Sequence, residues 1–134
     1  MIKEYTSLGF MSGTSGDGVD ASIICSDGNT KYEVIKDQYF EYEPDVYKKF
    51  HNIKCQINSV NELEQFQKEL NDLENKITLF HGKIGKEMIK DRKIDIIGFH
   101  GQTIYHSPEE KISKQLGNGK LLSQLLKKKC CIQF

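Results

Sequence analysis

The stretch LGFMSGTSGDGVDASII, residues 8–24, interrupts a hydrophobic run with small and polar residues and then resumes it. The apolar flanks favour two strands, and SGTSGDG at residues 12–18 favours a tight turn between them. Glycines in such a turn let backbone N–H groups approach a ligand closely, and successive amides can form an anion-binding concavity. The residues alone leave two interpretations in balance: a phosphate-binding loop, or a hairpin in which Asp17 and Gly18 serve only turn geometry.

Side chains of this turn add to the first interpretation. The hydroxyls of Thr14 and Ser15 can donate hydrogen bonds to phosphate oxygens. Asp17 would repel a phosphate, so its carboxylate favours a metal ion between the two, and Mg²⁺ binds through carboxylate and water. The turn lacks the G-x-x-x-x-G-K-[ST] spacing and is therefore not a P-loop.

A meander of three antiparallel strands is predicted around this turn. Residues 5–11 and 19–25 form its first two strands, and SDGN at residues 26–29 favours a second tight turn. Residues 32–43 alternate well enough for a third strand. The side chains expected to pack from this third strand are Tyr32, Val34, Tyr39 and Phe40.

Two helices are predicted next. Pro44 favours the start of a short helix through Phe50. A longer helix is expected from Ser59 to about Asp91, because Ser59 and Glu62 have the spacing of a capping box. The apolar residues of the longer helix fall on one face, at alternating spacings of three and four: Leu63, Phe66, Leu70, Leu73, Ile77, Phe80 and Ile84.

This apolar face allows either a partner helix that makes the chain an association domain, or a helix laid on the sheet of its own domain. Gly82 and Gly85 weaken a free-standing helix, which favours the second interpretation.

A short buried strand follows, formed by Ile94, Ile96, Ile97 and Phe99. The next residues carry polar side chains, at His100, Gln102, Thr103 and His106. Because ligands of open α/β sheets bind at the carboxyl ends of strands, this cluster favours a site that reads a polyhydroxylated substrate over a purely structural role. The six-residue separation of the two histidines argues against a metal site.

The remaining sequence predicts a loop at residues 117–119, a short helix through residues 121–126 and a strand that begins at Cys130. The element order is thus β-β-β-α-α-β-loop-α-β. This order indicates the α/β class, with a mixed sheet that starts with an antiparallel three-strand meander and carries helices packed on it.

Composition bounds the class of function. The 134 residues suit one domain, and 19 basic and 19 acidic side chains cancel, which argues against nucleic acid and membrane partners. No signal peptide or membrane-spanning run is visible, and the four cysteines show no C-x-x-C pair. We therefore expect a cytoplasmic protein.

Three motifs together resemble one family. FMSGTSGDGVDASI (residues 10–23), IDIIGFHGQTIYHSP (94–108) and QLGNGKLLSQLL (115–126) are similar, in order and spacing, to segments of the anhydro-N-acetylmuramic acid kinases. The resemblance spans residues 8–134. It implies the ribonuclease H-like, actin-like ATPase fold of the sugar kinase and Hsp70 superfamily, in which two lobes close over a nucleotide.

The resemblance also implies an activity. Members of this family use ATP and Mg²⁺ to phosphorylate 1,6-anhydro-N-acetylmuramic acid at O6 while water opens the anhydro ring. The product is N-acetylmuramic acid 6-phosphate, and the reaction serves peptidoglycan recycling. The partners expected from the resemblance are this amino sugar and ATP. A homodimer of the full-length protein is a further possibility.

Site residues follow from the matching motifs. The ATP-binding segment would comprise Gly13, Thr14, Ser15, Gly16, Asp17, Gly18, Val19 and Asp20, with Asp17 near the metal. The side of the cleft that faces the sugar would be lined by His100, Gly101, Gln102 and Thr103.

This sequence departs from the family pattern in three places. Gly16 stands where leucine is usual, and Asn118 stands where aspartate is common. The sequence stops at Phe134, before the family's Asp-Phe-Arg-like segment, its Gly-Ala-Pro stretch and the Asp-Thr-Gly-Pro motif that carries the catalytic base. We therefore expect residues 1–134 to be an incomplete N-terminal lobe without the catalytic base, inactive alone. The alternative is a non-catalytic module that binds a nucleotide or a sugar.

Overall fold

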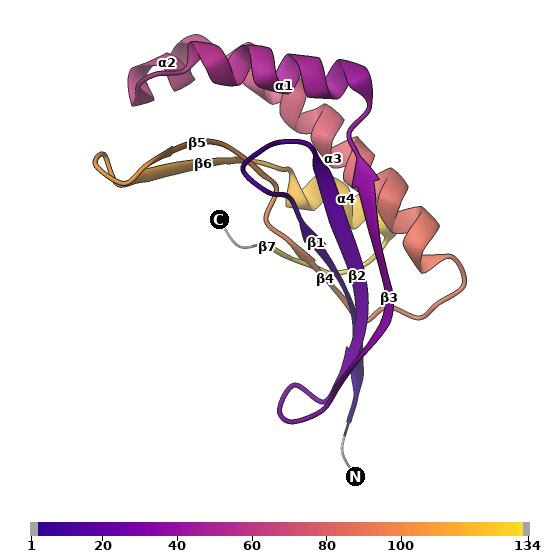
Figure 1. The fold of residues 1–134 in the computed structure, drawn as a ribbon. Coiled ribbons are helices and arrows are strands. Elements are labelled where there is room, and N and C mark those ends of the chain that lie inside the picture. Colours follow the sequence, from indigo (N-terminus) through magenta and orange to yellow (C-terminus); the bar gives the residue numbers. More distant parts are fainter. Residues whose placement is uncertain (1–2, 133–134) are drawn as a thin grey trace.

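A computed structural model describes residues 3–132, and within them a mixed five-stranded sheet forms the centre of the fold (Figure 1). The strand order is β3-β2-β1-β4-β7. The strands are β1 (Tyr5–Met11), β2 (Gly18–Ser26), β3 (Tyr32–Glu41), β4 (Ile96–Phe99) and β7 (Cys130–Ile132). The pairs β1–β2 and β2–β3 are antiparallel, whereas β1–β4 and β4–β7 are parallel. The predicted α/β class and the opening meander are confirmed, while Gln133 and Phe134 of the predicted last strand lie outside the described residues.

The helices are α1 (Pro44–Gln56), α2 (Val60–Gln65), α3 (Gln67–Ile89) and α4 (Gly119–Leu126). Helices α3 and α4 contact strands of the sheet, whereas α1 and α2 pack mainly against α3. The apolar stripe of α3, including Leu73, Ile77 and Ile84, is buried together with Leu8 and Ile23 of the sheet. The prediction that this helix packs on its own domain is therefore confirmed. No helix in residues 3–132 is both long enough and apolar enough to cross a membrane.

The predicted long helix is wrong at its start. The chain forms two helices, because Phe66 (φ −99°, ψ 16°) leaves helical geometry between α2 and α3. The predicted capping box is also wrong: the Ser59 hydroxyl donates to the Glu62 carboxylate and caps no backbone N–H. Helix α2 has no fully buried residue, and only Leu63 packs against the core from it, so packing does little to hold α2 in line with α3.

The predicted packing of β3 is wrong for three of its four residues. Tyr32, Val34 and Tyr39 are exposed, and only Phe40 is partly buried against the core. The reason is position, because β3 is an edge strand next to β2, while α3 contacts β1 and β2. An alternating pattern reports which residues share a strand face and does not report whether a helix covers that face.

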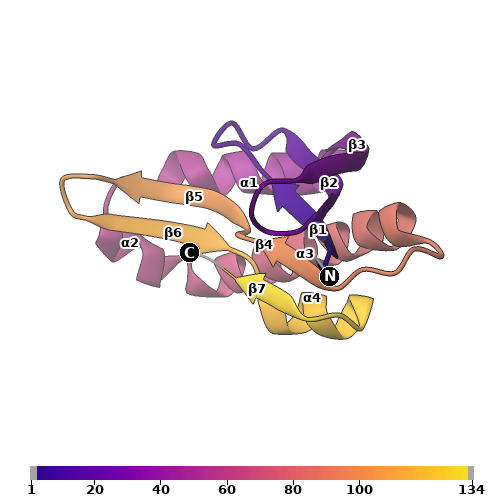
Figure 2. The same cartoon turned by 90° about the horizontal axis from the view of Figure 1, so that it is seen from below.

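A second hairpin, which the sequence did not predict, lies between β4 and the predicted loop at residues 117–119. It consists of β5 (Gln102–Ser107) and β6 (Ile112–Leu116), and it extends beyond the main sheet on the side where α2 lies (Figure 2). Gly101 (φ +75°) leads from β4 into this hairpin, and a Cβ there would lie 2.4 Å from the Leu116 carbonyl oxygen. The tight passage between β4 and β5 therefore requires glycine.

Helix α4 begins at Asn118, the position where an aspartate was expected. The Asn118 Oδ1 accepts a hydrogen bond from the Leu121 N–H at 3.0 Å. Since a carboxylate oxygen can cap a helix in the same way, we expect Asn118→Asp to leave the free energy of unfolding nearly unchanged. Asn118→Ala should lower it by about 1 kcal/mol. Urea denaturation of the two variants checks this, and equal losses would contradict the capping role.

His81 of α3 is buried in the core. Its Nδ1–H donates to the Ile77 carbonyl at 2.8 Å, and its ring makes edge contacts with Phe10 and Phe99 at 5.1 and 5.0 Å between centroids. Its Nε2 has no partner among the described residues. Burial lowers the pKa of His81 from 6.5 to about 4, so the ring is neutral in the folded protein.

This histidine should make stability depend on pH. A pKa that is lower in the folded than in the unfolded state gives stability that is present above pH 6.5 and is lost as the pH falls toward 4. We expect the His81 contribution to fall by about 2 kcal/mol between pH 7 and pH 5, and His81→Leu should remove that loss. Denaturation at both pH values measures it. His106→Leu, at an exposed histidine, is the matched control and should behave as wild type.

Candidate functional site

The glycine-rich turn at residues 12–17 joins β1 to β2, as predicted, and lies between α1 and β5 (Figure 1). A backbone hydrogen bond from the Gly16 N–H to the Gly13 carbonyl, at 3.2 Å, closes it. Gly13, Thr14 and Ser15 are exposed at its tip. The turn therefore presents its backbone to solvent at one end of the sheet.

The backbone groups of the turn are used unequally. The Gly13 carbonyl accepts from Gln102 Nε2 at 2.8 Å, and the Asp17 carbonyl accepts from the Tyr42 N–H at 3.0 Å. Within residues 3–132, by contrast, the N–H groups of Thr14, Ser15 and Asp17 have no hydrogen-bond acceptor. These three amides are therefore free to donate hydrogen bonds to an anion.

Ser12 adds an unsatisfied group at the base of the turn. Its side chain is 6% exposed, and its hydroxyl has no hydrogen-bond partner among the described residues. A buried hydroxyl without a partner is uncommon in folded proteins and is typical of sites where a ligand or water completes the bonding. The Ser12 hydroxyl also lies near the Tyr42 hydroxyl and acts to lower the pKa of Tyr42, against the larger effect of burial. The donors that the turn offers to a phosphate are therefore its free amides.

Gln102 connects the two predicted site segments. It is fully buried, and its Oε1 accepts from the Tyr42 hydroxyl at 2.8 Å while its Nε2 reaches the turn. Burial raises the pKa of Tyr42 to about 12, so this hydroxyl keeps the proton that it donates. Both the oxygen and the nitrogen of the Gln102 carboxamide thus have partners within the protein. The predicted contact of Gln102 with a ligand stays a prediction.

The other described residues of the predicted sugar side make no hydrogen bond to the turn. His100 is half-buried directly after β4, and Gly101 is buried. Thr103 is half-buried on β5, and its hydroxyl donates to Gln115 of β6. Among the described residues, Gln102 alone links the His-Gly-Gln-Thr segment to the turn.

Two glycines, Gly16 in the turn and Gly18 at the start of β2, have little room for a side chain. Gly16 has φ +69°, and a Cβ there would lie 2.2 Å from the Phe50 ring of α1. A Cβ at Gly18 would lie 2.3 Å from the Phe40 carbonyl oxygen of β3. Gly16, the departure that the sequence left unexplained, therefore has a physical reason, because Phe50 occupies the space that a side chain at position 16 would need.

The remaining residues of the predicted ATP segment differ in exposure. Val19 is fully buried in the core, so only its backbone could contact a ligand. Asp17 and Asp20 are exposed. Among residues 3–132, no three His, Cys, Asp or Glu side chains gather as a metal site, and the role of Asp17 toward Mg²⁺ stays a prediction. One carboxylate together with phosphate oxygens and waters is the usual protein environment of that ion.

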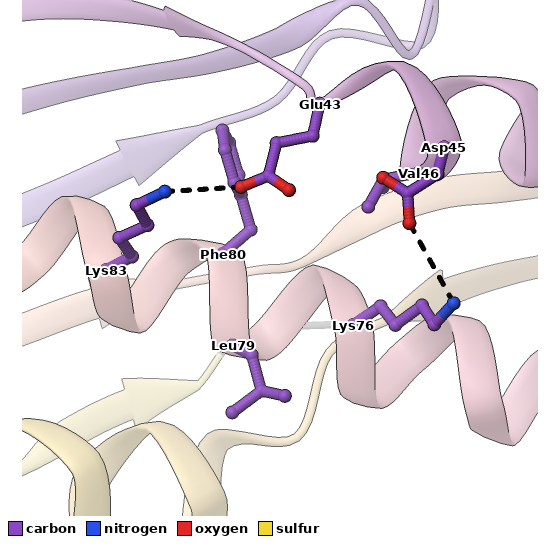
Figure 3. Close-up of a pocket in the computed structure, with 7 residues that line it drawn as sticks. All are labelled: Glu43, Asp45, Val46, Lys76, Leu79, Phe80 and Lys83. Atoms are coloured by element: carbon purple, nitrogen blue, oxygen red, sulfur yellow. Dashed lines mark hydrogen bonds and ion pairs between the residues drawn. The ribbon is translucent and has the colours of Figure 1, made fainter.

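A separate pocket of about 250 Å³ lies between the start of α1 and α3 (Figure 3). Lys83 pairs with Glu43 at 3.3 Å, and Lys76 pairs with Asp45 at 4.0 Å. These exposed ion pairs leave the pocket without an unpaired charge aimed into it. They join the first turn of α1 to α3.

Sequence reasoning missed four residues that hold the turn: Tyr42, Phe50, His51 and Lys54. Pro44 did predict the helix that carries three of them. No local pattern shows that this helix returns to a turn 35 to 40 positions earlier in the chain. In a single sequence, a basic residue on a helix is interpreted as exposed to solvent and an aromatic residue as part of the core, so neither indicates a contact with the turn.

Comparison with known proteins identifies similar sequences. The family described as anhydro-N-acetylmuramic acid kinase matches residues 5–130. A protein of that name from Pelagibacter ubique is 57% identical over 136 residues, which cover 100% of this chain and 36% of the relative. One from Agrobacterium fabrum is 33% identical, covering 92% of this chain and 35% of the relative. One from Brucella canis is 30% identical, covering 87% and 33%. The chain thus spans about a third of the length of these curated relatives.

Proposed function

The chain belongs to the anhydro-N-acetylmuramic acid kinase family, whose members have the actin-like ATPase fold, and we propose that the protein containing it phosphorylates 1,6-anhydro-N-acetylmuramic acid. The phosphoryl group of ATP passes to O6, and water adds at C1 as the C1–O6 bond of the anhydro ring breaks. The products are ADP and N-acetylmuramic acid 6-phosphate. This reaction would recycle peptidoglycan sugars in the cytoplasm, where ATP is supplied.

The observation that carries this proposal is the glycine-rich turn. Its free N–H groups at Thr14, Ser15 and Asp17 are donors suited to phosphate oxygens. Gly13, which is exposed, places no side chain over the backbone there. We expect these amides to hold phosphates of ATP and the exposed Asp17 carboxylate to share a Mg²⁺ ion with them.

Bound Mg²⁺-ATP would supply the phosphoryl group and neutralise its charge. The work of this chain in the proposed reaction is to hold phosphate by the turn and to orient it against the sugar. We propose that His100 and Thr103 line the side of the cleft that faces the sugar. They lie where the chain leaves β4 and enters β5. We assign the catalytic base to none of residues 3–132.

The test is sugar-dependent turnover by the protein that contains this chain. ADP release is followed with Mg²⁺-ATP in the presence and absence of 1,6-anhydro-N-acetylmuramic acid, and the product mass is measured in ordinary and ¹⁸O-labelled water. We expect sugar-dependent ADP and one ¹⁸O atom at C1 of the product. ATP binding without sugar-dependent ADP would reject the kinase and support a non-catalytic nucleotide-binding module.

A further inference from the structure

The last turns of α1 contact the glycine-rich turn through two basic side chains. Lys54 Nζ donates to the Thr14 carbonyl at 2.6 Å, and His51 Nε2 lies 3.3 Å from the Gly16 carbonyl oxygen. The Phe50 ring fills the space beside Gly16. Helix α1 thus contacts the turn at Thr14 and Gly16, while Gln102 holds the turn at Gly13.

Helix α1 is itself firmly held. Val46 and Phe50 are buried in the core, with exposed fractions of 5% and 0%. At its other end, Glu43 and Asp45 pair with lysines of α3 (Figure 3). A residue on such a helix can fix a loop in place, because the helix does not move with the loop.

The contact of Lys54 also has an electrostatic consequence. The turn carries a carboxylate at Asp17 and no basic residue of its own, whereas a P-loop contains its phosphate-binding lysine. Lys54 brings an ammonium group to Thr14 from 40 positions later in the chain. Three donors are available on that group, so the bond to Thr14 leaves others for an anion.

We propose that Lys54 is a positioning residue of the phosphate-binding turn. By holding the Thr14 carbonyl, while His51 lies against Gly16, it keeps the free amides of Thr14, Ser15 and Asp17 directed toward a bound anion. It also places a positive charge beside them. This inference rests on the proposed function and adds to it a residue outside the motif that binds the phosphates.

The experiment compares three variants in the protein that contains this chain. Lys54→Met removes the charge and the hydrogen bond and keeps the length of the side chain, while Lys54→Arg restores both. Lys48→Met, at an exposed lysine of the same helix, is the matched control. Mg²⁺-ATP affinity is measured by titration calorimetry, and amide hydrogen exchange of residues 13–17 is measured without nucleotide.

We expect Lys54→Met to bind Mg²⁺-ATP about tenfold more weakly, because a charge-assisted hydrogen bond to the turn is lost. Exchange at residues 13–17 should accelerate, and KM for ATP should rise more than kcat falls. Lys54→Arg should recover most of the affinity, and Lys48→Met should match wild type. A thermal midpoint equal to that of the control shows that the fold is intact.

Wild-type affinity and exchange in Lys54→Met would overturn the inference. So would a loss of affinity that Lys54→Arg fails to restore, since that would indicate packing alone. The proposed function fails separately, by an absence of sugar-dependent ADP or of ATP binding in the wild type. In that case exchange of residues 13–17 without nucleotide still decides whether Lys54 positions the turn.

Discussion

Gly16→Leu is expected to lower the free energy of unfolding by about 4 kcal/mol, even though leucine is the residue that the family resemblance places at this position. The backbone at Gly16 has φ +69°, which costs an L-residue about 1–2 kcal/mol. The larger part of the loss comes from crowding, because a Cβ would lie 2.2 Å from the Phe50 ring. Phe50 is fully buried and cannot move aside without disturbing the core.

The matched control for this prediction is Gly28→Leu in the turn between β2 and β3. Gly28 also has positive φ (+76°), but no atom lies within 4 Å of the position of its Cβ. Guanidinium denaturation should therefore show a loss of about 1–2 kcal/mol for Gly28→Leu, clearly smaller than for Gly16→Leu. Equal losses would show that backbone conformation alone explains the glycine.

A double-mutant cycle identifies Phe50 as the cause. Phe50→Leu should be destabilising alone, since it shortens a buried ring. Combined with Gly16→Leu it should cost less than the sum of the two single losses, because the smaller side chain leaves room at position 16. Additive losses would mean that Phe50 does not determine the residue at position 16.

Local patterns in the sequence predicted the parts of this fold that depend on neighbouring residues. The glycine-rich turn, the SDGN turn and the helix start at Pro44 each follow from residues within a few positions, and all are present. The break at Phe66 could not be predicted, because the apolar periodicity continues through it. The β5–β6 hairpin was missed because polar residues at its start were interpreted as a ligand-binding loop.

In the candidate site, too, local residues indicated the turn, whereas the distant residues that support it could not be predicted. The residue types of the turn left a phosphate-binding loop and a plain hairpin in balance, and the family resemblance favoured the first and supplied the ligand. The supports of the turn come from residues 25 or more positions away: Tyr42 is 25 positions from Asp17, Lys54 is 40 from Thr14, and Gln102 is 89 from Gly13. Such pairs follow from tertiary packing and leave no periodic signal in a single sequence.

Gln102→Leu is expected to lower the free energy of unfolding by about 3 kcal/mol, because it leaves two polar groups without their partner. Tyr42 is buried, with 6% of its surface exposed, and its hydroxyl would lose its acceptor, Gln102 Oε1. The Gly13 carbonyl would lose its donor, Gln102 Nε2. Leucine has a similar volume, so the loss should reflect hydrogen bonding more than a cavity. Urea denaturation measures the change.

Tyr42→Phe separates the two hydrogen bonds of Gln102. It removes the hydroxyl and leaves the bond from Nε2 to the Gly13 carbonyl in place, so Mg²⁺-ATP affinity should stay close to wild type. Gln102→Leu should weaken that affinity, because the turn loses its attachment to β5. The double variant should be less destabilised than the sum of the two single variants, since the same hydrogen bond is removed in both. If Tyr42→Phe and Gln102→Leu weakened ATP binding equally, the attachment to Gly13 would not be what directs the turn toward the nucleotide.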